Sequence, residues 1–399
     1  MSAPSRIAVV GASAAGLSVV EGVRRAGYAG RLTLIGEEQH LPYDRPPLSK
    51  QLLAGEWDTE RLLLRAPEAI TTLDLDLRLG SAAVALDTRA GEISLADGSR
   101  VGYDALVVAT GTRARRLRGT EGVAGVHVLR TLEDALALRE DLAARPHLLV
   151  VGGGFVGAEA AAVARGLGCE VTLVTDTAQP MSDALGDDLG AMLRAVHVEH
   201  GVRIESGVLV DQVLTADWQA TGVRLADGRT IAADAVLVGI GAQPNVEWLT
   251  GSGVPVGNGV ECDATLYAGS GVWAAGDVAS WPHPHTGEPR RIEHRTNAAE
   301  QGLAVARNIL AGPEHATPFD SVPYVWSDQY DLKVQIYGRT RGADQVRIVE
   351  GSLEDRKLVA LYGKGGRVCG VAGVNLPRAT RTYRNAVAEA VPFEEASVA

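Results

Sequence analysis

Residues 7–16 read Ile-Ala-Val-Val-Gly-Ala-Ser-Ala-Ala-Gly, and this stretch decides the fold of the first part of the chain. Its short apolar run is typical of a buried strand and passes directly into a turn bounded by Gly11 and Gly16. A helical stretch follows to about Ala26, and a second apolar strand spans residues 32–35. A strand, a helix and a second strand in this order predict an α/β fold with a parallel sheet.

The same design occurs a second time. Residues 148–157 read Leu-Leu-Val-Val-Gly-Gly-Gly-Phe-Val-Gly, and they precede a helical stretch to about Gly168 and a strand over residues 170–174. One glycine-rich turn is a weak signal, because such turns also occur without a ligand. Two of them, each between a strand and a helix, are much more specific.

Later segments repeat as well, at a constant offset of 130 residues. Leu-Ala-Asp-Gly occurs at 95–98 and again at 225–228, and Asp-Gly between apolar runs indicates a hairpin. Buried-strand patterns close the two copies at 104–111 and 234–241. The repeat predicts two domains of one topology.

Each glycine-rich turn is suited to a dinucleotide. The first Gly permits the tight turn, the middle position lets a pyrophosphate approach the backbone, and the third Gly lets helix and strand pack closely. The phosphates then meet the N–H groups and the dipole of the helix start. The candidate cofactor-binding residues are Gly11, Ser13, Ala14, Ala15, Gly16, Ala109, Thr110 and Gly111 in the first copy, and Gly152, Gly154, Phe155, Val156, Gly157 and Gly241 in the second.

The residue after the second strand differs between the copies. Glu37 can accept hydrogen bonds from the hydroxyls of an adenosine ribose, and Glu38 beside it is interpreted as a solvated loop acid. The second copy has Thr175 there, followed by Asp176, and no Arg within several residues that could bind a 2′-phosphate. We therefore expect NADH, with Asp176 substituting for the missing acid, while NADPH stays open.

Composition and charge limit the class of protein. With 399 residues, 46% apolar and 22% charged, the chain is typical of a globular protein of two or three domains. Its net charge of -11 argues against nucleic acid as the main partner. No apolar run approaches the ~20 residues of a membrane span. Because the N-terminus passes almost at once into an apolar strand, we expect no signal peptide. We expect a cytoplasmic protein, a monomer or homodimer, without a membrane partner.

Five further motifs are typical of one family: Pro42-Tyr-Asp-Arg-Pro-Pro-Leu-Ser-Lys50, Val128-Leu-Arg-Thr131, Gly276-Asp-Val278, Arg291-Ile-Glu-His-Arg-Thr-Asn-Ala298 and Trp326-Ser-Asp-Gln-Tyr330. With the two glycine turns, they resemble the oxygenase-coupled NAD(P)H ferredoxin reductases from Ile7 to about Arg384. The resemblance implies two Rossmann-like dinucleotide-binding domains, for FAD (1–111 and 242–320) and NAD(H) (112–241), and a C-terminal α+β interface domain (321–399). It also implies a [2Fe-2S] ferredoxin as acceptor, serving a monooxygenase or dioxygenase.

Short apolar runs support the C-terminal domain. They cover residues 333–337, 346–349, 358–362 and 368–374, and they predict an antiparallel sheet accompanied by a helix.

The resemblance also assigns site residues. The FAD contacts it implies are Gly11, Ala15, Gly16, Glu37, Arg45, Lys50, Val84, Arg130 and Asp277. Asp277 could instead cap the turn that follows it. Arg295 is a further candidate cofactor contact that departs from the family, which usually has an aromatic there, and it could stack on a ring, contact an acidic partner or change access to the flavin edge.

Three residues are candidates for the chemistry. Lys50 is one of only four lysines among 38 basic residues, which fits a compact charge that stabilises reduced flavin better than a surface cation. By resemblance, Glu159 orients the nicotinamide carboxamide; as an alternative, the acid only stabilises its helix start. By resemblance, Trp326 shields the flavin and lies on the electron exit route; otherwise it is a core residue.

The cysteines exclude one class of reaction. Disulfide reductases of this architecture need a redox cysteine near the flavin, yet Cys169, Cys262 and Cys369 are sparse and none precedes residue 169. The histidine pair His283 and His285 is interpreted as solvated, and no metal is expected.

The acceptor is the least specific part of the interpretation. Ferredoxins are acidic, so a basic patch is expected, for which the candidates are Arg290, Arg291, Arg295, Arg339 and Arg341. Scattered solvated arginines are the alternative. The rival functions are a rubredoxin reductase and a flavin-based NADH sensor like apoptosis-inducing factor.

Overall fold

The computed structural model describes residues 4–283 and 287–396, and the chain divides into two compact units. Unit 1 comprises the chain up to Asp44, Glu60–Arg113 and Gln243–Ser321. Unit 2 comprises Arg45–Thr59, Ala114–Ala242 and the chain from Val322 onward. The boundaries between three domains stay a prediction, and His285 lies outside the described residues.

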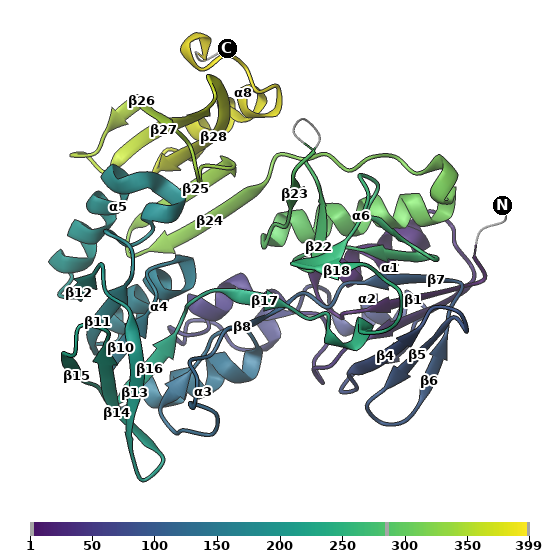
Figure 1. The fold of residues 1–399 in the computed structure, drawn as a ribbon, viewed down its shortest axis with the longest axis horizontal. Helices are drawn as coiled ribbons and strands as arrows, with labels where there is room; N and C mark the ends of the chain where they lie inside the picture. Colours follow the sequence, from purple (N-terminus) through teal and green to yellow (C-terminus); the bar gives the residue numbers. More distant parts are fainter. Residues whose placement is uncertain (1–3, 284–286, 397–399) are drawn as a thin grey trace. The chain divides into compact units, whose positions relative to one another are not determined.

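A six-stranded sheet of order β20-β21-β7-β1-β2-β3 forms the centre of unit 1 (Figure 1). Its strands are β1 (Arg6–Val10), β2 (Arg31–Ile35), β3 (Asp76–Arg78), β7 (Ala105–Val108), β20 (Tyr267–Gly269) and β21 (Val272–Ala274). Both neighbours of β1 run parallel to it. Because successive side chains of a strand point to opposite faces, β1 contributes to two layers of the core.

On one face, Ile7 and Val9 pack with helices α1 (Ala14–Arg25) and α6 (Arg295–Ala311). On the other face, Ala8 and Val10 pack with the antiparallel sheet of β4 (Ala83–Asp87), β5 (Glu92–Leu95) and β6 (Arg100–Gly102). The central sheet of unit 1 therefore has helices on one face and a small antiparallel sheet on the other.

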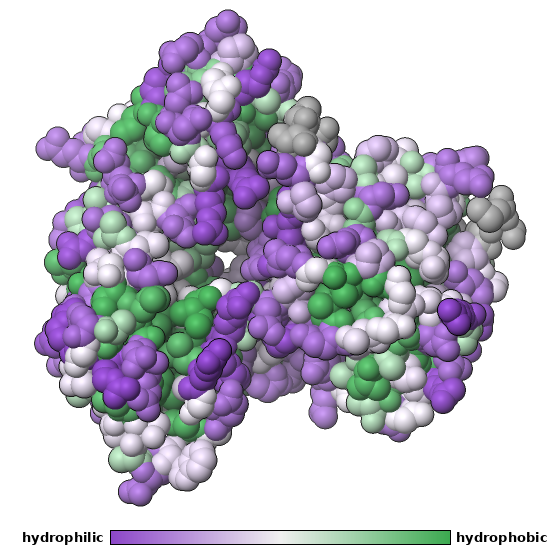
Figure 2. All heavy atoms as spheres, in the orientation of Figure 1, coloured by the Kyte–Doolittle hydropathy of each residue, from purple (hydrophilic) through white to green (hydrophobic). Residues whose placement is uncertain are grey.

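Unit 2 repeats this plan around a parallel sheet of order β12-β11-β10-β16-β9. Its strands are β9 (Val126–His127), β10 (His147–Val151), β11 (Glu170–Thr175), β12 (Arg203–Ser206) and β16 (Ala235–Val238). The antiparallel layer is β13 (Val210–Ala216), β14 (Gln219–Leu225) and β15 (Thr230–Ala232), and the helices are α3 (Leu132–Leu142), α4 (Phe155–Gly166) and α5 (Ser182–Glu199). Figure 2 shows hydrophobic residues gathered in patches among hydrophilic ones on the visible face.

The predicted repeat is confirmed at both hairpins and both closing strands. The N–H of Leu95 donates to the carbonyl of Ser99, and the N–H of Leu225 donates to that of Arg229. Val10 pairs with Val108 in unit 1, as Val151 pairs with Val238 in unit 2.

The C-terminal part of unit 2 is an antiparallel sheet of order β24-β25-β28-β27-β26. Its strands are β24 (Tyr324–Gln329), β25 (Leu332–Gly338), β26 (Gln345–Ser352), β27 (Lys357–Lys364) and β28 (Arg367–Val374). One face packs against α5, while the other is covered by the chain around α7 (Pro377–Thr382) and α8 (Arg384–Ala388). The α/β fold class with a C-terminal α+β part is confirmed, but β24 was missing from the expected strands.

The remaining elements are short. They are α2 (Pro67–Thr71), β8 (Thr112–Ala114), β17 (Ala242–Pro244), β18 (Val256–Gly257), β19 (Gly259–Glu261), β22 (Ala279–Pro282), β23 (Pro289–Arg290), and the 3₁₀ turns η1 (Pro46–Ser49), η2 (Glu60–Leu62), η3 (Glu247–Leu249), η4 (Pro313–His315) and η5 (Phe393–Glu395). Over the residues described, no helix combines the length and the apolar character needed to cross a membrane.

Candidate functional site

The first glycine turn lies in unit 1, between β1 and α1. Gly11 has φ +123°, and a Cβ added to it would lie 2.0 Å from the carbonyl oxygen of Ala109. A Cβ on Gly16 would lie 2.0 Å from the carbonyl oxygen of Gly11. Ser13 is the N-cap of α1, and its side chain makes no capping hydrogen bond. The buried helix start, Ala14-Ala15-Gly16, therefore has no side-chain cap on its N–H groups, which suits a phosphate.

The second glycine turn has the same geometry in unit 2. A Cβ on Gly152 (φ +106°) would lie 2.3 Å from the carbonyl oxygen of Gly239, and one on Gly157 would lie 2.0 Å from that of Gly152. Gly154 is the uncapped N-cap of α4, which begins with Phe155 and Val156. A Cβ on Gly154 meets nothing within 4 Å. The residues present thus fit one dinucleotide in each unit.

The loops that close the two turns differ in detail. In unit 1, the Thr110 hydroxyl donates to the carbonyl of Asn245 at 2.8 Å, and the Asn245 amide donates back to the carbonyl of Thr110 at 3.0 Å. Gly111 accepts from the N–H of Asn245. In unit 2, Gly241 has φ +91° and accepts from the N–H of Arg115. Asn245 therefore holds the first closing loop, and the sequence motifs did not indicate it.

The acids after the second strands are placed as follows. Glu37 is exposed at the end of β2. Glu38 is half-buried and accepts a short hydrogen bond from the Tyr43 hydroxyl, so its interpretation as a merely solvated acid was wrong. Thr175 is only 2% exposed, and its hydroxyl is 2.8 Å from that of Thr177. Asp176 is exposed and is the carboxylate available at this strand end.

Lys50 and Glu159 form a buried ion pair in unit 2. Lys50 follows the η1 turn, Glu159 lies in the first turns of α4, and the Nζ–Oε2 distance is 2.7 Å. The two side chains are 9% and 4% exposed. Ser49 Oγ donates to the same carboxylate oxygen at 2.5 Å. Two residues that the sequence assigned separately, to flavin and to nicotinamide, are therefore direct partners.

The other carboxylate oxygen of Glu159 accepts a hydrogen bond from a residue of β24. Ser327 Oγ donates to Oε1 at 2.7 Å, and Gln329 Nε2 lies 3.1 Å from Ser327 Oγ. Beyond Gln329 lies His197 of α5, which is 1% exposed and whose pKa burial lowers to about 4. No sequence pattern indicated these contacts, because α4, α5 and β24 are far apart along the polypeptide.

Arg45 and Arg130, two expected FAD contacts, also lie together in unit 2. Arg45 Nη1 donates to the carbonyl of Arg130 at 2.6 Å. The N–H of Arg130 donates to Asp134, whose N–H in turn donates to the Thr131 hydroxyl in the capping box that begins α3. The helix cap thus fixes the backbone that Arg45 contacts.

Three other expected FAD contacts lie in unit 1. Asp277 follows Gly276, whose N–H donates to Gln301 of α6 at 2.8 Å. Val84 on β4 is 51% exposed. Arg295, at the start of α6, donates to Asp44 at 2.6 Å. The acid that Arg295 contacts in the structure is therefore part of this chain, and it belongs to the Pro42–Lys50 motif.

Trp326 is half-buried on β24. It stacks with Tyr324 at a ring-centroid distance of 5.9 Å, and Tyr324 contacts Tyr337 of β25 at 4.7 Å. Strand alternation puts this aromatic cluster on the face of β24 opposite to Ser327. One face of β24 thus contributes to the aromatic cluster, and the opposite face contributes Ser327, which hydrogen-bonds Glu159.

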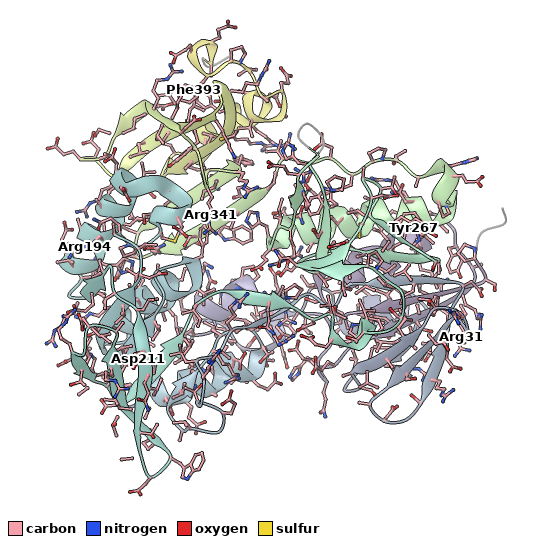
Figure 3. All side chains as sticks on the ribbon, in the orientation of Figure 1. Arg31, Arg194, Asp211, Tyr267, Arg341 and Phe393 are labelled. Atoms are coloured by element: carbon pink, nitrogen blue, oxygen red, sulfur yellow. The ribbon has the colours of Figure 1, made fainter. Side chains whose placement is uncertain are left out.

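The five arginines expected to form a basic patch are divided between the units and are largely engaged. Arg290 lies 4.6 Å over the Trp281 ring, Arg291 pairs with Glu293 at 2.5 Å, and Arg295 pairs with Asp44. In unit 2, Arg341 lies beside α5 and pairs with Asp183 at 3.0 Å (Figure 3). Arg290, Arg291 and Arg295 are thus engaged within unit 1, whereas the Arg341 side chain is 71% exposed in spite of its ion pair.

The environment of all three cysteines favours the unreactive thiol over the thiolate. Burial raises the pKa of Cys262 to about 12, and it raises the pKa values of Cys169 and Cys369 above their ordinary value. A thiolate is the nucleophile in disulfide exchange, so none of the three is prepared for it. Among the described residues, no group of three or more His, Cys, Asp and Glu side chains could hold a metal.

We expect turnover to survive the loss of all three thiols. A variant with Cys169, Cys262 and Cys369 replaced by Ala should retain kcat within about twofold of the parent if it folds, because none acts as a nucleophile. Steady-state reduction of ferricyanide checks this. Loss of turnover with the fold and flavin content intact would restore a disulfide-type mechanism.

Comparison with known proteins finds families and relatives that match nearly the whole chain. Residues 5–302 match the family model described as pyridine nucleotide-disulphide oxidoreductase, and residues 324–399 match the reductase C-terminal model. The chain is 36% identical to rhodocoxin reductase of Rhodococcus erythropolis, covering 97% of this chain and 90% of the relative. It is 39% identical to the ferredoxin–NAD(+) reductase component of the p-cumate 2,3-dioxygenase system of Pseudomonas putida, covering 94% and 91%.

A solved structure agrees with these relatives. The covalent putidaredoxin reductase–putidaredoxin complex matches with a TM-score of 0.91 and 33% identity, covering 97% of this chain and 94% of that one. The resemblance seen in the sequence motifs is confirmed. The chain is an oxidoreductase that belongs to the pyridine nucleotide-disulphide oxidoreductase family, among the ferredoxin reductases of oxygenase systems.

Proposed function

We propose that this enzyme passes electrons from NADH through FAD to a [2Fe-2S] ferredoxin that serves an oxygenase, in the cytoplasm. The observation that carries the proposal is the pair of equivalent glycine turns, one in each unit, in each of which a Cβ on the third glycine would lie 2.0 Å from a carbonyl oxygen. Two dinucleotide sites in one chain without a reactive thiol suit hydride transfer to a flavin. The names of the relatives supply the ferredoxin.

We assign FAD to the turn in unit 1. Gly11, Ser13 and the start of α1 would hold its pyrophosphate, Glu37 its adenosine ribose, and Asp277 its ribityl chain. The other proposed contacts are Val84, Ala109, Thr110, Gly111, Arg45, Lys50, Arg130 and Arg295. When bound, the flavin supplies the conversion of a two-electron donor into single electrons.

We assign NADH to the turn in unit 2, with its pyrophosphate at the start of α4 and its adenosine ribose at Asp176. Glu159 lies in the same helix, two residues after Gly157. Its carboxylate orients the nicotinamide end, and the Lys50 ammonium offsets negative charge as hydride is transferred. The buried ion pair holds both side chains in place before NADH binds.

The proposal is tested with purified protein. It should be yellow, contain one FAD per chain, and reduce a [2Fe-2S] ferredoxin at the expense of NADH. Equal activity toward rubredoxin would favour the rubredoxin reductase, while reduction by NADH without rapid turnover of any acceptor would favour a redox sensor. A colourless protein that does not take up FAD would refute the whole assignment.

Discrimination between NADH and NADPH should depend on Asp176. Thr175 is buried with its hydroxyl beside Thr177, so Asp176 is the side chain placed to accept from a ribose 2′-hydroxyl and to repel a 2′-phosphate. Asp176→Ala should lower the NADH/NADPH ratio of kcat/KM about tenfold, the cost of one charged hydrogen bond. Glu170→Ala, at the opposite end of β11, is the matched control and should change nothing. A parent enzyme that prefers NADPH would contradict the assignment.

Trp326 should matter for the oxidative half-reaction. Trp326→Ala should slow electron delivery to ferredoxin about tenfold, which corresponds to a barrier change of about 1.4 kcal/mol. Reduction by NADH should remain within several-fold of the parent. Stopped-flow reduction and reoxidation, recorded separately, check this. A variant that is slow in reduction and normal in reoxidation would reverse the role.

A further inference from the structure

A continuous chain of buried hydrogen bonds joins α5 to the Lys50–Glu159 pair. From Glu159 it runs to Ser327, to Gln329 and then to His197, whose Nε2 lies 3.0 Å from Gln329 Oε1. On the other side of the ring, His197 Nδ1 lies 3.0 Å from the Tyr330 hydroxyl. The side chains of Ser327, Gln329 and His197 are buried, with at most 1% exposure.

With Glu159 ionised and the Gln329 amide oriented as in the structure, the hydrogen bonds from Gln329 to Glu159 have one direction. The ionised carboxylate of Glu159 only accepts, so Ser327 donates to it, and Ser327 in turn accepts from the Gln329 amide nitrogen. The Gln329 oxygen then needs a donor, which is the Nε2–H of His197. A neutral imidazole has one donor, so Nδ1 accepts from the Tyr330 hydroxyl. Burial supports the neutral form, because it lowers the pKa of His197 to about 4.

The orientation of the Gln329 amide decides whether this series of hydrogen bonds can form. If the Gln329 amide turned around, its oxygen would face Ser327, and the Ser327 hydroxyl would donate to Gln329. Glu159 Oε1 would then lose the donor that lies 2.7 Å away. As the Nε2–H tautomer, His197 opposes this turn, because its one donor matches the oxygen of Gln329 and would face the amide N–H groups after the turn. A residue outside the site thus controls a hydrogen bond to the carboxylate within it.

We propose that His197 is a positioning residue: by fixing the Gln329 amide, it keeps the Ser327 hydroxyl on Glu159 and so holds the Glu159–Lys50 pair in its reactive arrangement. This inference rests on the proposed function for its kinetic consequence, although the hydrogen-bond chain stands without it. The hydrogen bonds also join three elements, α4, α5 and β24. Through them, the C-terminal sheet contributes to the proposed nicotinamide site.

The experiment is a double-mutant cycle between His197→Leu and Ser327→Ala. Each single variant should slow flavin reduction at saturating NADH about tenfold, because Ser327→Ala removes the hydrogen bond to the Glu159 carboxylate and His197→Leu removes the contact that keeps Ser327 on it. The double variant should be no slower than either single one, since both act through the same hydroxyl. The Kd for NADH should change by less than about twofold, because the chain does not include the glycine turn. His197→Gln, which can both donate and accept, should restore most of the rate.

The matched control is His200→Leu. His200 is exposed at the end of α5 and stacks on the same Tyr330 ring at 3.7 Å, but it lies outside the path to Glu159. Its replacement should leave the reduction rate unchanged. Additive losses in the cycle, or a normal rate in His197→Leu, would overturn the proposal.

A second measurement needs no turnover. Histidine-selective ¹⁵N NMR of the holoprotein should show His197 as the neutral Nε2–H tautomer, with no titration between about pH 5 and 8. The Nδ1–H tautomer or an ordinary titration would overturn the proposal even if the enzyme is a reductase. Conversely, the expected tautomer in a protein that NADH does not reduce would refute the function and leave the hydrogen-bond chain intact.

Discussion

Replacing Lys50 by Ala should slow reduction of the flavin by NADH about tenfold to a hundredfold, a barrier increase of about 1–3 kcal/mol. The ammonium is a compact charge held in a buried site, where electrostatic interactions are stronger than in water. The structure adds a second consequence. Glu159 would be left 4% exposed without its cation, and breaking a buried ion pair in this way costs about 3–5 kcal/mol of stability.

The two consequences can be separated with a neutral pair. Lys50→Met combined with Glu159→Gln removes both charges together, so most of the lost stability should return. The rate should not return, because hydride transfer depends on the charges themselves. Thermal unfolding and stopped-flow reduction, with FAD content measured in every variant, give the two quantities. If the double variant recovered the parent rate, the Lys50 ammonium would have no part in the chemistry.

A methyl group on the third glycine of either turn should abolish one cofactor function and spare the other. In both Gly16→Ala and Gly157→Ala the new Cβ would lie 2.0 Å from a carbonyl oxygen, and the backbone must shift at the point where the phosphates are held. We expect Gly16→Ala to be purified without FAD. Gly157→Ala should retain FAD and be reduced by dithionite, with KM for NADH raised about a hundredfold, which corresponds to about 2.7 kcal/mol.

Two other glycines of unit 2 serve as controls. A Cβ on Gly166, at the end of α4, meets nothing within 4 Å, and Gly166→Ala should have no effect. A Cβ on Gly154 also meets no protein atom within 4 Å, yet Gly154 lies where the pyrophosphate would approach. Gly154→Ala should therefore raise KM for NADH without loss of stability. Loss of FAD from Gly157→Ala, and not from Gly16→Ala, would mean that the two cofactors are assigned to the wrong turns.

The sequence was sufficient for features that depend on local backbone geometry. Gly11 and Gly152 were predicted because each needs a positive φ and a close approach of the neighbouring loop, and the structure has both features. The two Asp-Gly hairpins were predicted for the same reason. Strand β24 escaped prediction because its residues Ser327, Asp328 and Gln329 interrupt the apolar pattern. Two of these polar residues are buried in the hydrogen-bond chain to Glu159.

Features that depend on tertiary contacts were not accessible from the sequence. Lys50 and Glu159 were each identified, but 109 positions separate them and no spacing rule predicts their ion pair. His197 carried no motif at all, and its importance follows from burial and from its two hydrogen-bond partners. The expected basic patch stays a prediction for a related reason. Arginine counts do not indicate which side chains are already paired with acids of the same chain.

The most direct test of the account is anaerobic stopped-flow absorbance in two stages. NADH mixed with the oxidised enzyme should bleach the flavin band in a single turnover, and subsequent mixing with an oxidised [2Fe-2S] ferredoxin should restore it while the ferredoxin becomes reduced. Two ferredoxins should be reduced per NADH, because NADH supplies two electrons and each cluster accepts one. A flavin that NADH reduces but that only oxygen reoxidises would contradict the account, as would a flavin that NADH does not reduce.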